Sequence, residues 1–86
     1  MKTIYDPAYR SMVANLRAAR LRRRLRQEDV AIKLGVTRTW VAKVEMCEIC
    51  LDILQMVHLA HVYGLRAYEL VREVEERERV TGDRGT

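Results

Sequence analysis

The stretch QEDVAIKLGVTRTWVAKVE, residues 27–45, decides the fold because it repeats a short helical pattern on either side of one apolar turn. Apolar residues recur at the three-four spacing of a single helix face over residues 27–34 and again over residues 38–45. Gly35 can adopt the positive φ that ends the first helix, and Thr37 is a good N-cap for the second. The residues expected to be buried are Val30, Ala31, Leu34, Val41 and Val44.

Each of these helices is about two turns long and would be marginal alone in water, so neighbouring helices must hold them. One is predicted from Asp6 and Pro7, a capping residue followed by a proline at the first helical position. Asp52 can cap another, which Gly64 ends, and the last begins at about Arg66. The expected buried faces are Tyr9, Met12, Val13, Leu16 and Ala19 in the first, Ile53, Met56, Val57, Ala60 and Tyr63 in the second, and Leu70, Val71 and Val74 in the last.

With five helical patterns, no strand signal and no internal repeat, the predicted fold class is all-α. A chain of 86 residues is too small for two independent cores, so one domain is expected. We divide it into residues 1–15, an N-terminal segment with the start of the first helix, residues 16–70, the central domain, and residues 71–86, a charged helix end and tail. There is no apolar run of roughly 20 residues and no secretory signal, so a cytoplasmic protein without membrane contact is expected.

Charge is divided unevenly along the chain. Residues 1–43 hold eleven Lys and Arg against three Asp and Glu, a balance of +8, whereas residues 44–86 have a balance of −4. Six arginines, at positions 17, 20, 22, 23, 24 and 26, directly precede the stretch 27–45. Such a cluster is typical of a surface for a polyanion, most often nucleic acid, although a solvated helix face is the alternative.

The chain from about residue 16 to residue 70 resembles the Xre/Cro-type, lambda-repressor-like helix-turn-helix family. The resemblance covers ten positions without a gap: Arg20, Gln27, Val30, Ala31, Leu34, Gly35, Val36, Thr37, Val41 and Glu45. It implies that residues 27–34 and 38–45 are the two helices of the motif, with the second in the DNA major groove. It also implies a largely buried salt bridge between Arg20 and Glu45.

The resemblance further implies which side chains meet DNA. Those pointed at base edges are Arg38, Thr39 and Lys43, with Trp40 beside them. Arg38 is the best candidate because arginine can form a two-pronged hydrogen bond to guanine. For Trp40 a packing role between helices is the alternative. The residues expected near phosphates are Gln27, Thr37, Arg26 and Arg24.

Three junctions depart from the family pattern. Arg24 stands where a Gly or Asn usually ends the first helix, Arg26 where a Ser or Thr usually caps the second, and Cys47 where a Gly usually follows the third. Each change removes a favourable terminus at a cost of roughly 1 kcal/mol. The first two add positive charge near the expected phosphate path, so we interpret them as a gain in backbone affinity.

Cys47, Cys50, His58 and His61 are four potential zinc ligands. Only seven residues separate the two pairs, against about 12 in a zinc finger, and the histidines fall inside a predicted helix. We therefore expect no metal and no other cofactor. Two ordinary loop thiols are favoured, with a redox disulfide as the alternative.

The sequence thus predicts a sequence-specific regulator of transcription, a repressor by default, that binds double-stranded operator DNA as a homodimer in the nucleoid. The candidate dimer surfaces are the first helix and the apolar edge of the last. No nucleophile, base and orienting residue occur together, so we do not expect an enzyme or a small-molecule ligand. The alternative function is an antitoxin or protein-interaction module built on the same fold.

Overall fold

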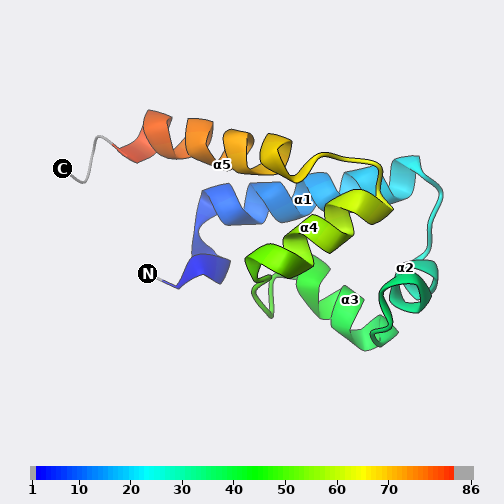
Figure 1. Cartoon of the computed structure of the whole chain (residues 1–86). Coiled ribbons are helices and arrows are strands. Elements are labelled where there is room, and N and C mark those ends of the chain that lie inside the picture. Colours follow the sequence, from blue (N-terminus) through cyan, green and yellow to red (C-terminus); the bar gives the residue numbers. More distant parts are fainter. Residues whose placement is uncertain (1, 83–86) are drawn as a thin grey trace.

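The computed structural model describes residues 2–82, and within them the chain forms a 3-10 turn and five α-helices, with no strand (Figure 1). The elements are η1 (Thr3–Tyr5), α1 (Pro7–Arg22), α2 (Gln27–Leu34), α3 (Arg38–Glu45), α4 (Ile53–Val62) and α5 (Ala67–Gly82). The all-α class and the five predicted helices are confirmed. None of the helices in this part of the chain is both long and apolar enough to cross a membrane.

The predicted helix ends have the expected local chemistry. The Asp6 side chain accepts a hydrogen bond from the backbone N–H of residue 8 (2.8 Å), and Thr37 accepts one from the N–H of residue 40 (3.0 Å). Asp52 likewise accepts from the N–H of residue 55 (2.7 Å). Gly35 (φ 69°) and Gly64 (φ 72°) both adopt the left-handed conformation just after α2 and α4. Each cap satisfies a backbone group that the helix itself leaves unpaired.

Two of the junctions that depart from the family pattern adopt the same left-handed conformation without glycine. Arg24 and Cys47 both have a φ of 57°, immediately after α1 and α3 respectively. For a residue with a Cβ this conformation costs about 1–2 kcal/mol. At both positions the backbone therefore has the less favourable helix end that the sequence predicts.

In Figure 1, α1 and α5 run side by side in opposite directions, and α2 and α3 lie away from the C-terminal half of α5. α1 also packs against α3, and α4 packs against both α2 and α5. The core lies where these helices meet, and its most deeply buried large side chains are Leu59, Val13, Val30 and Val41. Of the remaining residues expected to be buried, Leu34, Met56, Val57 and Val74 are half-buried.

Two expected core residues are instead exposed. Ile53 retains 74% of its accessible surface and Val71 retains 48%. Periodicity places each on the apolar face of its helix but does not tell whether another element covers that face. Here both side chains line an open groove between α4 and α5, which explains both errors.

Candidate nucleic-acid interface

A buried carboxylate, that of Glu45 at the end of α3, joins three helices. Arg20 on α1 donates from Nε to Glu45 Oε2 (2.6 Å) and from Nη2 to Oε1 (2.9 Å). Gln27 at the start of α2 donates from Nε2 to Glu45 Oε1 (2.9 Å). The predicted pair of Arg20 and Glu45 is therefore present, and its two side chains are only 7% and 8% exposed.

Further contacts complete this cluster. Arg20 donates from Nη1 to the carbonyl oxygen of Leu25 (2.8 Å), which fixes the loop between α1 and α2. Arg17, more than half exposed, lies with Nε 3.7 Å from Glu45 Oε1. Hydrogen bonding to Glu45 raises the pKa of Arg20, so the guanidinium stays charged. The ion pair thus fixes α3 relative to α1 and to the start of α2.

Tyr63, at the end of α4, lies close to this ion pair. Burial, reinforced by the negative charge of Glu45 and opposed by the positive charge of Arg20, raises the pKa of Tyr63 to about 12. The phenol therefore stays neutral at any physiological pH. The charges of Arg20 and Glu45 compensate each other without a contribution from Tyr63.

The ion pair and the core hold one side of α3 and leave the other side in solvent. At 3.6 residues per turn, Val41, Val44 and Glu45 share the inner side. Thr39 and Lys43 lie on the opposite side, and Arg38 is the first residue of the helix. All three are exposed, and we call the surface that they form the outer side of α3. The outer side of α3 therefore presents two cations and a hydroxyl within two turns of a fixed helix.

Trp40 lies between these two sides. It is half-buried and packs against the hydrophobic core. The residues around it come from α1, α3 and α4 and include Leu16, Val44 and Leu59. This arrangement favours the packing role over direct contact with DNA for most of the indole ring.

The structure places the four predicted phosphate contacts at the ends of α1, α2 and α3. Gln27 uses its side-chain N–H in the bond to Glu45, and Thr37 uses its hydroxyl as the cap of α3. Arg24 is exposed in the loop before α2. Gln27 and Thr37 therefore already have partners within the chain.

Arg26 has a partner that the sequence analysis missed. Its backbone N–H donates to Asp29 Oδ2 (2.7 Å), and its guanidinium lies 3.1 Å from Asp29 Oδ1. An arginine side chain has no acceptor and cannot cap the helix, so Asp29 supplies the local contact instead. The three-residue spacing of these opposite charges at the start of a helix is the signal that could have revealed it.

The cysteines and histidines do not come together. Cys47 is buried and Cys50 is exposed, both as free thiols, and His58 and His61 are exposed on α4. Within residues 2–82, no three His, Cys, Asp or Glu side chains lie close enough to hold a metal ion. Cys47 serves as a core residue beside α3.

Comparison of the chain with protein-family models, with curated proteins and with solved structures gave no match. The resemblance to the helix-turn-helix family therefore rests on the ten-position sequence pattern alone.

Proposed function

We propose that this chain is a sequence-specific double-stranded DNA-binding regulator of transcription with a lambda-repressor-like helix-turn-helix formed by α2 and α3. In this proposal α3 enters the major groove, and α2 lies across the sugar-phosphate backbone. The observation that carries it is the outer side of α3, where Arg38, Thr39 and Lys43 are exposed while Glu45 is held by α1 and α2. A side chain that reads bases needs such a fixed support, because a small displacement breaks a two-pronged hydrogen bond.

The roles proposed for individual side chains follow from their chemistry. Arg38 reads a guanine, a contact worth about 1–3 kcal/mol of discrimination. Lys43 binds either a second guanine or a phosphate, and Thr39 offers a hydroxyl and a methyl group to the bases. Arg24 and the start of α2 contact phosphates, which position the protein without specifying sequence.

Exposed cations on α1 and α2 also support the proposal. Arg22 and Arg24 at the end of α1, and Lys33 on α2, are exposed. Together with the outer side of α3 they supply the positive surface that attracts DNA phosphates. A protein-interaction module has no comparable need for a basic outer side on α3.

Binding as a homodimer is part of the proposal, because one such domain reads only a few base pairs and two half-sites about 34 Å apart give adequate specificity. On the apolar edge of α5, Leu70 is buried and Val74 packs against the core, but Val71 is 48% exposed. On α1, Leu21 is about half exposed, so both helices remain candidates for the contact. Repression then follows from occupancy of the operator.

A gel-shift assay with DNA from upstream of the gene tests the proposal. Purified wild-type protein should give a discrete complex that resists excess nonspecific competitor at near-physiological salt. Arg38→Ala should lose it, whereas Arg72→Ala, which removes the same charge from an exposed position on α5, should retain it. Weak binding that competitor removes equally from all three proteins would contradict the proposal.

A further inference from the structure

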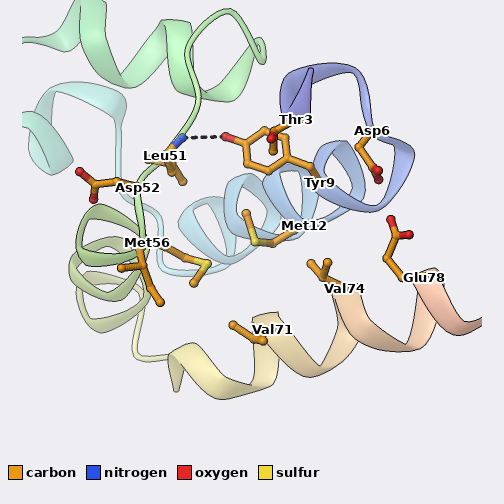
Figure 2. Close-up of a pocket in the computed structure, with 11 residues that line it drawn as sticks. Thr3, Asp6, Tyr9, Met12, Leu51, Asp52, Met56, Val71, Val74 and Glu78 are labelled. Atoms are coloured by element: carbon orange, nitrogen blue, oxygen red, sulfur yellow. Dashed lines mark hydrogen bonds between the residues drawn. The ribbon is translucent and has the colours of Figure 1, made fainter. Parts of the chain in front are cut away.

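A second surface lies at the other end of the molecule. It is a groove of about 410 Å³ between the N-terminal half of α1, the start of α4 and the flank of α5 (Figure 2). In Figure 2, Met12 and Met56 converge from α1 and α4 toward Val71 and Val74 of α5. A groove of this size accepts two or three large apolar side chains.

The apolar surface of the groove is open to solvent. Ile53 at its edge is 74% exposed, and Val71 on α5 is 48% exposed. Isolated exposed apolar residues are ordinary, but exposed apolar side chains gathered along one groove are typical of a surface for a macromolecule.

Within residues 2–82, every charged residue that lines the groove is acidic. These residues are Asp6, Asp52 and Glu78, which come from three different parts of the chain. Figure 2 shows Asp6 and Glu78 near one end of the groove and Asp52 near the other. An apolar floor with carboxylates at both ends is complementary to apolar side chains flanked by cations.

The groove is separate from the proposed DNA surface. It lies along the first turns of α1, whereas Arg22 and Arg24 of the proposed DNA surface lie at the other end of that helix. Sixteen residues of α helix span about 24 Å. Both surfaces can therefore be occupied at the same time.

We infer that this groove binds a basic amphipathic helix of a partner protein, with apolar side chains seated between α4 and α5 and Lys or Arg residues beside Asp6 and Asp52. Binding of an amphipathic helix in an apolar groove is a general mode of recognition. The inference does not depend on the DNA-binding proposal, because it uses none of the same side chains.

A second copy of this chain is a poor occupant. A two-fold interface places the same patch on both sides, so the acidic ends of one groove would meet those of the other. Like charges brought together in this way oppose association. The basic half of another copy could approach, but that head-to-tail contact would not close into a dimer.

The test uses a fluorescent synthetic helical peptide with leucines at i, i+4 and i+7 and lysines on both flanks, together with a version in which glutamates replace the lysines. Anisotropy measures the binding of each peptide to the full chain. We expect the lysine peptide to bind and the glutamate peptide to bind at least about tenfold more weakly. Equal binding of the two peptides, or no binding of either, would overturn the inference.

Matched variants locate the binding site. Ile53→Lys should weaken binding of the lysine peptide by about tenfold, whereas Leu54→Lys, on the same turn of α4, should leave that binding unchanged. Asp52→Asn, which keeps a capping side chain at the start of α4, should weaken binding of that peptide by about threefold at low salt and less at high salt, whereas Glu75→Gln should have little effect. Equal effects within either pair would place the peptide elsewhere and overturn the inference.

Sedimentation analysis and gel-shift assays distinguish this inference from the proposal that the chain binds DNA. A dimer that Ile53→Lys dissociates and Leu54→Lys does not would make a second copy the occupant, and so contradict the inference. Operator binding by Ile53→Lys should equal that of the wild type. Loss of peptide binding with retained DNA binding therefore concerns the groove alone.

Discussion

At the scale of single residues, the ion pair of Arg20 and Glu45 makes the clearest prediction. Arg20→Met or Glu45→Leu should each cost about 3–5 kcal/mol of unfolding free energy, because each strands one buried charge. The double variant should cost much less than the sum of the two, since no buried charge is left. Urea unfolding measures all three free energies.

Arg17→Met is the control for this experiment. Arg17 approaches the same carboxylate, but its side chain is 57% exposed, so its loss should cost under about 1 kcal/mol. If the two single costs simply add in the double variant, the pair is not coupled and the account of the buried network is wrong.

Tyr63 makes a prediction about pH. Its pKa is raised from 10 to about 12 in the folded protein, so the neutral phenol stabilises the fold fully below pH 10, and this stability is lost as the pH rises toward 12. Two pKa units correspond to roughly 2–3 kcal/mol. Tyr63→Phe should therefore lose less stability than the wild type between pH 10 and pH 12 in urea titrations.

The exposed Tyr68 provides the comparison for that experiment. Tyr68→Phe removes a phenol from the surface and should lose stability over the same pH range as steeply as the wild type does. Parallel curves for wild type and Tyr63→Phe would show that burial of Tyr63 does not oppose its ionisation.

At the scale of elements, the junction between α1 and α2 tests the balance between stability and DNA affinity. The variant Arg24→Gly with Arg26→Ser should melt a few degrees higher, because glycine relieves the left-handed strain at residue 24 and serine can cap α2. If both arginines contact phosphates, the slope of log affinity against log salt should fall by up to about 2.

The slope should fall by less than about 2 if Arg26 keeps its ion pair with Asp29 when DNA binds, because that arginine then neutralises no phosphate. Arg23→Gly is the control for melting. Arg23 has an ordinary φ of −84°, so glycine relieves no strain there and increases the conformational entropy of the unfolded chain. An unchanged salt slope in the double variant would contradict the proposed phosphate role of this junction.

The helices themselves could be predicted because their signals are local. A capping side chain, a glycine and a three-four apolar spacing each act within one turn, so residues such as Asp52 and Gly64 mark helix ends before any tertiary contact is known. What could not be predicted depends on neighbours distant in sequence. Ile53 and Val71 are exposed because no other helix within residues 2–82 covers the groove that they line, and periodicity carries no information about that.

The candidate site was predictable to a similar extent. The exposure of Thr39 and Lys43 follows from the helical spacing that buries Val41 and Val44, and Arg38 is exposed as the first residue of its helix. The bond from Gln27 to Glu45 spans 18 residues and follows only from the crossing of α2 and α3, and so did not emerge from the sequence alone.

At the scale of the whole molecule, the uneven charge of the sequence corresponds to two surfaces. The basic residues gather around the end of α1 and the outer side of α3, while carboxylates surround the groove at the beginning of α1. We expect the two surfaces to act independently, with DNA at one and a basic partner at the other. Both proposals use the α-helical core as a rigid support.

Selection of DNA duplexes from a random library by the full chain tests the central claim most directly. The account predicts that the wild type enriches one short motif containing a guanine, and that Arg38→Ala loses the preference for that guanine while Arg72→Ala keeps it. Enrichment of no common motif, or the same motif with Arg38→Ala, would contradict the claim that α3 reads DNA sequence.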